Sequence, residues 1–134
     1  MLIKKEVFQN VGVFDEKFFL YTEDTDFCYR VIKFGYKIYL SPKAKIFHKV
    51  HKSSRANFAS LPLYYTTRNR LYFSRKHFVQ YYPLTFVYIS STMLIKSMYW
   101  LLVGKIKNIS VVLRAFHDFL AGNMGMTKHD FSVK

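Results

Sequence analysis

The side chains most suited to chemistry in this sequence lie in residues 21–30, which read Tyr-Thr-Glu-Asp-Thr-Asp-Phe-Cys-Tyr-Arg. Three carboxylates, Glu23, Asp24 and Asp26, fall within four positions, although the sequence has only 8 acidic residues against 21 lysines and arginines. Between Phe27 and His117 there is no carboxylate at all, while sixteen Lys and Arg occur there. Acids gathered ahead of such a basic stretch indicate a site built from carboxylates rather than a solvated surface.

A helix beginning near Thr22 would position these acids. Phe27, Val31 and Phe34 fall on one helical face, and Gly35 stands where a left-handed stop is expected. The acids then occupy the first helical turn, where unsatisfied backbone N–H groups and the positive end of the helix dipole favour their ionised forms. Asp26 and Arg30 are four residues apart, so the sequence also predicts a structural ion pair between them.

The elements on either side are shorter. Apolar residues at Ile3, Val7, Phe8 and Val11 predict a helix over 3–11 that ends at Gly12. Residues 14–21 mix aromatic and acidic residues without a period, which suits a partly buried loop in which Asp15 could simply cap or turn the chain. Alternating residues over 36–40 and 44–48, separated by Ser41-Pro42, predict two short strands.

Beyond residue 61 the sequence predicts aromatic-rich helices over 63–77, 83–103 and 110–120. Residues 83–103 contain one charge, Lys96, and are long enough to span a bilayer. A lysine near the middle of a span is costly, however, so a helix that lies at a membrane interface or packs on protein is favoured over a span. In that helix, one side carries polar residues and the other carries apolar residues. The polar side holds Thr85, Ser90, Thr92, Lys96 and Ser97, and the apolar side holds Leu84, Val87, Tyr88, Leu94, Ile95, Met98, Leu101 and Leu102.

Composition limits the class of protein. With 134 residues, 51% of them hydrophobic, the chain is one ordinary domain with ample material for a core. A formal charge of +13 calls for a partner that tolerates positive charge, such as nucleic acid, an anionic membrane face or a phosphorylated substrate, and the aromatic content of 19% favours the last two. Cys28 is the single cysteine, so no intramolecular disulfide requires an oxidising compartment, and no secretory signal opens the chain.

The first half of the sequence resembles a known family. Residues 11–30, which read Val-Gly-Val-Phe-Asp-Glu-Lys-Phe-Phe-Leu followed by the acidic stretch, then Gly35-Tyr36, Pro42 and His48, resemble the acceptor-side half of inverting family 2 glycosyltransferases. Rhamnosyltransferase-like members are the most similar. Tyr65 with Arg68-Asn69 also looks like the motif that opens the C-terminal helices of many such enzymes.

The resemblance implies an α/β, partial GT-A-like fold for residues 1–60, with helices and two short strands, and a mainly helical, membrane-associated region over 61–134. Asp24 would be the general base that takes the proton of the acceptor hydroxyl, and Glu23 would orient the acceptor or the loop. Asp15 and Arg68 are the candidate substrate-binding residues. His48 matches a position that approaches the metal and the diphosphate in some relatives, or it is an ordinary strand-end histidine. A zinc pair with His51 lacks further ligands.

The sequence also departs from that family. No Asp-x-Asp motif precedes residue 24, so the nucleotide-binding half that holds Mg²⁺ or Mn²⁺ on the donor diphosphate is absent, and Val13 replaces a frequent glycine. The expectation is therefore a fragment of a glycosyltransferase that does not transfer sugar alone. Its partners would be a nucleotide-sugar, a glycan or lipid-linked acceptor, and the anionic cytoplasmic face of a membrane, which it would meet peripherally or through one transmembrane helix.

The alternative function is a small, basic, non-enzymatic protein that binds membranes or nucleic acid. Aromatic residues interleaved with arginine between Tyr64 and Arg75 could stack on bases. The sequence has no helix-turn-helix, zinc or RNA-recognition signature, so no nucleic-acid partner is expected.

Overall fold

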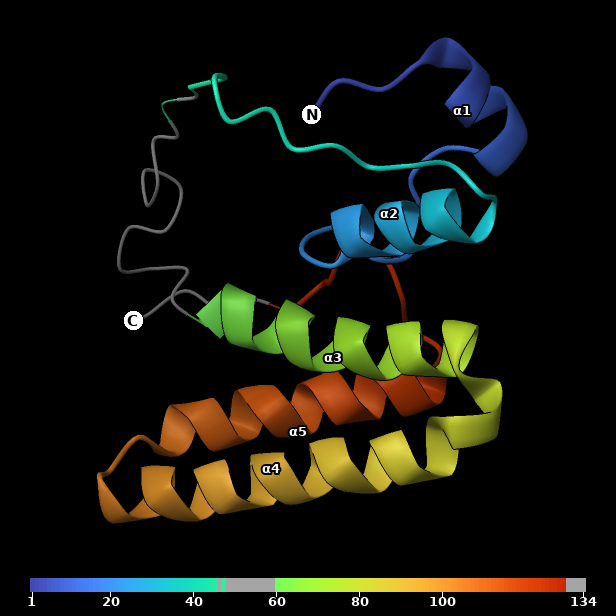
Figure 1. Cartoon of the computed structure of the whole chain (residues 1–134). Helices are drawn as coiled ribbons and strands as arrows, with labels where there is room; N and C mark the ends of the chain where they lie inside the picture. The colour runs from blue at the N-terminus through green and yellow to red at the C-terminus, as the bar shows by residue number, and fades with distance from the viewer. Residues whose placement is uncertain (46, 48–59, 130–134) are drawn as a thin grey trace.

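The computed structural model describes residues 1–45, 47 and 60–129, and the elements in these residues are all helices (Figure 1). They are α1 (Lys5–Val11), α2 (Glu23–Lys33), α3 (Ser60–His77), the 3₁₀ helix η2 (Val79–Tyr81), α4 (Tyr82–Leu102) and α5 (Ile106–Ala121). Every α-helix predicted from periodicity is present, with ends shifted by a few residues. Figure 1 shows α3 between α2 on one side and the α4–α5 pair on the other.

The glycine stops explain where the first two helices end. Gly12 follows α1 with a φ of 85°, and Gly35 follows the last turn of α2 with a φ of 86°. L-residues with a side chain adopt this left-handed region at a cost, whereas glycine adopts it freely. Both predicted stops are therefore confirmed.

The predicted α/β class is wrong for the described part of the chain, because residues 36–45 and 47 contain no strand. Ser41-Pro42 does form the expected turn, closed by a hydrogen bond from Ala44 N to Ser41 O of 3.2 Å. Alternation gives these residues β-propensity, but a strand also needs a neighbour to complete its hydrogen-bond ladder. Tyr39 and Leu40, which are 81% and 92% exposed, have no such neighbour among the described residues. The remaining residues of the second predicted strand, 46 and 48, lie outside the described residues.

Three apolar clusters hold the described helices together. The first joins α1 to α2 and consists of Val7, Val11, Phe27 and Val31, with Phe8 and Phe14 packed on it. The second joins α3 to α5 through Tyr64, Tyr65, Val111 and Ala115, and the third joins α3, α4 and α5 through Leu71, Ile89, Met93, Val112 and Phe119. Where α2 meets α3 the contact is largely polar and aromatic, and it contains the buried Asp26.

Helix α4 packs an apolar face, centred on Ile89 and Met93, against the protein. The predicted polar side flanks that face: Thr85 and Thr92 are half-buried, whereas Lys96 is exposed. The two threonine hydroxyls donate to carbonyl oxygens of their own helix, Thr85 Oγ1 to Tyr82 O at 3.0 Å and Thr92 Oγ1 to Ile89 O at 2.8 Å, so they can lie partly buried at little cost. The buried Ser90 Oγ has no hydrogen-bond partner among the described residues, and the predicted apolar side faces outward. No helix within the described ranges combines the length and the apolarity needed to cross a membrane.

Candidate acidic site

The loop that leads into α2 has an unusual backbone. Phe19, Tyr21 and Thr22 all have positive φ, at 61°, 63° and 74°. Three non-glycine residues in this region within four positions are uncommon, and each costs on the order of 1 kcal/mol or more unless the surroundings compensate. Thr22 is also the cap residue of α2, but its side chain makes no capping hydrogen bond. The start of α2 must therefore be held by contacts from elsewhere.

Asn69 of α3 supplies the main contact. Its amide nitrogen Nδ2 lies 2.9 Å from Phe18 O, 2.9 Å from Leu20 O and 2.8 Å from Tyr21 O, so its two N–H groups are shared among three carbonyls of the loop. Asn69 is completely buried. Because the amide is buried, water cannot replace it as the hydrogen-bond donor to these carbonyls. Asn69 therefore holds the strained loop in one conformation.

Arg68 braces the same loop from the preceding position. Its guanidinium is 1% exposed and donates to Gly125 O at 2.8 Å and Asn123 O at 3.2 Å, with a weaker contact to Lys17 O at 3.4 Å. The arginine thus joins the loop to the segment that follows α5. Two further bonds go to side chains, from its Nε to Asn69 Oδ1 and from its Nη1 to Tyr64 Oη, both at 3.3 Å. The predicted contact of Arg68 with substrate stays a prediction.

An ionic cluster connects α2 with the C-terminal end of α3. The Asp26 carboxylate is completely buried and accepts bonds from Arg30 Nε at 2.9 Å, from Lys76 Nζ at 2.7 Å and contacts His77 Nε2 at 2.6 Å. Burial by itself raises the pKa of Asp26, but the hydrogen bonds from Lys76, His77 and Arg30 outweigh burial and hold the pKa below its usual value. The predicted Asp26–Arg30 pair is confirmed, and it belongs to a larger cluster.

Arg30 also ties the end of α1 to this cluster. Its Nη1 donates to Val11 O and its Nη2 to Val13 O, both at 2.7 Å. These carbonyls flank Gly12, where the chain leaves α1. One guanidinium therefore fixes the start of the loop and the helix that follows it.

Asp15 is the second acid of the cluster. Its Oδ2 accepts from Lys76 Nζ at 2.7 Å and from Tyr72 Oη at 3.1 Å, and its Oδ1 accepts from Lys17 N at 3.0 Å. Burial favours the neutral acid, yet the Lys76, Lys17 and Tyr72 bonds lower the pKa of Asp15 below its usual value. The interpretation of Asp15 as a residue that turns the chain agrees with the Lys17 bond, and its predicted contact with substrate stays a prediction.

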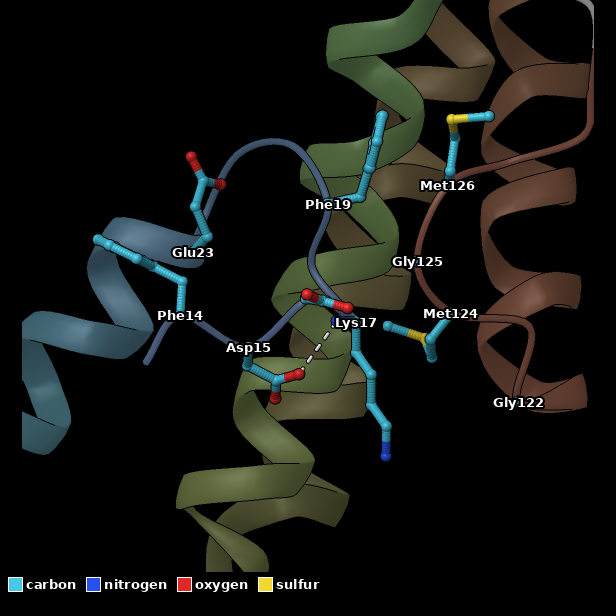
Figure 2. A pocket seen from close by; sticks show the side chains of 10 residues that line it. Phe14, Asp15, Lys17, Phe19, Glu23, Gly122, Met124, Gly125 and Met126 are labelled. Atoms are coloured by element: carbon cyan, nitrogen blue, oxygen red, sulfur yellow. Dashed lines mark hydrogen bonds between the residues drawn. The ribbon is translucent and has the colours of Figure 1, made fainter. Parts of the chain in front are cut away.

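A pocket of about 700 Å³ opens beside these residues (Figure 2). Its lining comes from the loop, from the first residue of α2 and from the segment after α5: Phe14, Asp15, Glu16, Lys17, Phe19, Glu23, Gly122, Met124, Gly125 and Met126. Figure 2 shows Met124 and Met126 on one side and Phe14, Asp15 and Glu23 on the other. The Glu23 Oε2 oxygen is buried and accepts no hydrogen bond from the described residues.

Asp24 lies next to Glu23 but does not line the pocket. Its side chain is exposed, and its Oδ1 accepts from Thr25 N at 2.7 Å and Thr25 Oγ1 at 3.3 Å. The structure thus separates the three clustered acids: Asp26 points into the protein, Glu23 lines the pocket and Asp24 faces solvent. The predicted catalytic roles of Asp24 and Glu23 stay predictions.

The residues that position this site were only partly visible in the sequence. Seven residues of α3 contact the loop or α2 in two adjacent rows with four-residue spacing: Arg68, Tyr72 and Lys76 in one, and Tyr65, Asn69, Phe73 and His77 in the other. Residues so spaced share one helical face. The signal in the sequence is this double row of polar and aromatic side chains, whose positive charge is opposite to that of the acidic stretch. The sequence singled out Tyr65, Arg68 and Asn69 but not the other four.

The structure provides no ligand set for the expected metal in the part of the chain that it describes. No group of three or more His, Cys, Asp or Glu side chains there is arranged to hold a metal ion. His48, the candidate metal residue, and His51 lie outside the described residues. The expected Mg²⁺ or Mn²⁺ stays a prediction, and no step below uses it.

Comparison with known proteins shows partial similarity of this chain to enzymes of one class, the glycosyltransferases. No family model matches the chain, and no solved structure matches it. Among curated proteins, the chain is 32% identical over 85 residues to the dTDP-rhamnosyl transferase RfbF of Shigella flexneri, a match that covers 58% of this chain and 29% of that protein. It is 38% identical over 56 residues to the N-acetylglucosaminyl-diphospho-decaprenol L-rhamnosyltransferase of Mycobacterium tuberculosis, covering 41% of this chain and 18% of that protein.

The predicted resemblance to rhamnosyltransferases is therefore confirmed as partial sequence similarity. It supports a glycosyltransferase-like function. In both cases the match takes in less than a third of the relative's length, so the activity of those whole proteins is not transferred to this chain by similarity alone.

Proposed function

We propose that this chain contributes the acceptor-side carboxylate site of an inverting glycosyltransferase. The observation that carries the proposal is the placement of Glu23 and Asp24 in the first turn of α2, beside a pocket and on a loop braced by Asn69. A general base must hold a fixed position relative to the acceptor hydroxyl. Hydrogen bonds and packing from neighbouring residues are what fix that position. The similarity to two rhamnosyltransferases supports the class of reaction.

In the proposed reaction Asp24 is the general base. Its carboxylate takes the proton of the acceptor hydroxyl while that oxygen forms a bond to the anomeric carbon of the donor sugar. The bond from that carbon to the diphosphate oxygen breaks, and the nucleoside diphosphate leaves with the electron pair. Oδ1 of Asp24 is occupied by Thr25, so Oδ2, to which the described residues donate no hydrogen bond, is the oxygen that would take the proton.

Glu23 has a separate role in the proposal. Glu23 lines the pocket, so its carboxylate is placed to accept a hydrogen bond from a second hydroxyl of the acceptor and so orient the sugar. Phe14, Phe19 and the two pocket methionines provide apolar surface against which a sugar face could pack. Glu23 would then act mainly on acceptor binding and Asp24 mainly on the chemical step.

The substrates follow from the names of the relatives. We propose a dTDP-rhamnosyl or related nucleotide-sugar donor, and a glycan or polyprenyl-diphosphate-linked acceptor at the cytoplasmic face of a membrane. The donor-binding residues and the divalent metal would come from a nucleotide-binding region of the kind that the sequence of this chain lacks. The chain alone is accordingly expected to be inactive.

A chimera tests the proposal. The segment of the Shigella relative that aligns with this chain is replaced by the corresponding residues of the chain, and transfer from a dTDP-rhamnosyl donor to a lipid-linked acceptor is measured. Asp24→Asn should lower kcat by about 10²- to 10⁴-fold, the range for loss of a general base. Glu23→Gln should mainly raise the KM for the acceptor. Glu6→Gln, on the exposed surface of α1, is the matched control. An Asp24→Asn chimera that turns over like the unaltered one refutes the assignment.

The alternative is a basic membrane-binding protein without catalytic activity. The outward-facing apolar side of α4 favours this alternative, because such a surface can bind a membrane whether or not the protein is an enzyme. A chimera that binds vesicles but shows no transfer, with both acids intact, would support this alternative.

A further inference from the structure

The solvent-facing side of α4 carries an apolar stripe that is interrupted by the exposed Ser91. Its members follow one another at intervals of one, three or six residues, and each is between 59% and 86% exposed: Leu84, Val87, Tyr88, Leu94, Ile95, Met98, Tyr99 and Leu102. At 1.5 Å per residue the stripe runs roughly 30 Å along the helix. An exposed apolar surface of that length marks an interaction site rather than scattered surface residues.

The charges around the stripe are all positive. Lys96 on α4, Lys105 and Lys107 at the turn into α5, and Arg114 on α5 are exposed. Asp118 is the only carboxylate between residues 60 and 129, and it is 5% exposed and bonded to Tyr64 and His129. No acidic group in this part of the chain therefore offsets the cations that border the stripe.

These two properties select one partner among those that cover apolar surfaces. A second copy of the chain would bring its own formal charge of +13 against the same charge, which opposes association. A surface that combines anionic headgroups with an accessible acyl layer matches both the cations and the apolar stripe. No helix of the described chain is suited to crossing a membrane, so such binding would be parallel to the surface.

We propose that the α4 stripe, flanked by Lys96, Lys105, Lys107 and Arg114, is the surface through which this protein docks onto an anionic lipid bilayer. The apolar side chains enter the boundary between headgroups and acyl chains, and the four cations contact lipid phosphates. This inference specifies the membrane part of the proposed function. Its test needs no catalysis, so its failure leaves the transferase proposal standing, and the reverse also holds.

The experiment uses the full 134-residue chain with vesicles of phosphatidylcholine, alone or with about a quarter phosphatidylglycerol. The double variant Leu94→Asn/Ile95→Asn removes two residues from the stripe. The matched control is Leu40→Asn/Ile32→Asn, which changes the same residue types at exposed sites, 92% and 60% exposed, far from α4 in sequence. Circular dichroism and the emission of Trp100, the only tryptophan, verify that each variant is folded.

We expect sedimentation with the anionic vesicles, weakened by salt, and little with neutral ones. The stripe variant should bind the anionic vesicles at least about tenfold more weakly than the unaltered chain, while the control stays within about twofold. Lys96→Gln/Lys105→Gln should weaken binding to anionic vesicles selectively. Equal binding by the stripe variant and the control overturns the proposal. So does a stripe variant that abolishes self-association in gel filtration while the unaltered chain ignores vesicles, or binding to oligonucleotides but not to vesicles.

Discussion

The side chain of Asn69 donates to the carbonyl oxygen of Tyr21, 48 residues earlier in the chain, at 2.8 Å. This bond joins α3 to the left-handed loop that directly precedes Glu23 and Asp24. The position of the two carboxylates therefore depends on a residue that is itself buried and remote in sequence. Stability and the geometry of the acidic site are coupled at this bond.

The first prediction concerns that coupling. Asn69→Ala leaves three loop carbonyls without their buried donor and no longer offsets the strain of the positive φ angles, so it should lower the free energy of unfolding by about 1–3 kcal/mol. Urea denaturation followed by circular dichroism measures the change. Asn10→Ala removes an exposed asparagine from α1 and should cost less than about 0.5 kcal/mol. Equal losses for the two variants would contradict the bracing role of Asn69.

The second prediction concerns the buried acid. Asp26→Asn keeps the shape of the side chain but removes the charge that Arg30, Lys76 and His77 share, and it should cost about 3 kcal/mol of unfolding free energy. Thermal unfolding of the variant measures this loss. Glu6→Gln is the matched carboxylate change, because Glu6 makes only an exposed 3.7 Å pair with Lys4, and it should have almost no effect. A stable Asp26→Asn variant would show that the cluster contributes little.

The third prediction is the dependence of stability on acid. The pKa values of Asp15, Asp26 and Asp118 lie below the ordinary 3.8, because hydrogen bonds outweigh the opposing effect of burial in each case. A depressed pKa stabilises the folded state at pH values above the unfolded pKa, and that contribution disappears as pH falls through the folded value. We expect constant stability from neutral pH to about pH 5 and a decline below about pH 4. Asp26→Asn should flatten the decline by up to about 1.4 kcal/mol per pH unit. An unchanged slope would contradict the cluster's role.

The fourth prediction lies at the alkaline end. Burial, followed by the charge and the hydrogen bond of Asp15, raises the pKa of Tyr72 to about 12. A raised pKa means that the contribution of Tyr72 is complete below pH 10 and is lost as pH rises toward 12. Tyr72→Phe should therefore lose about 1 kcal/mol at neutral pH but show a shallower alkaline decline, measured by urea denaturation across that range. Tyr88→Phe, at an exposed site, should leave both quantities unchanged.

The sequence predicted those features that depend on local pattern. The helices follow from apolar spacing, the stops at Gly12 and Gly35 from glycine's freedom at positive φ, and the Asp26–Arg30 pair from four-residue spacing. Each of these relations spans fewer than ten residues. The similarity to rhamnosyltransferases was likewise carried by a short run of residues, and the comparisons confirm it.

The features that the sequence missed depend on distant partners. Alternation over 36–40 predicted a strand, but no partner strand is present in the described part of the chain to complete it. Asn69, Lys76 and His77 reach loop residues and α2 residues 48 to 61 positions away, and no local pattern specifies such pairings. For α4, the spacing predicted the outward apolar side, whose residues are exposed in the structure. It missed the second apolar face at Ile89 and Met93, which packs against α3 and α5 and lies between the residues predicted to form the polar side.

The start of α2 lies near one end of the α4 stripe. Thr22 and Thr25, on either side of Glu23 and Asp24, line a pocket of about 400 Å³ together with Thr85, Tyr88 and Ile89 of α4. Tyr88 belongs to the stripe, so with the stripe seated at a bilayer the two carboxylates would stand near the phospholipid headgroups. A lipid-anchored acceptor would then reach them without an extended saccharide stem, because its own diphosphate lies at the same depth.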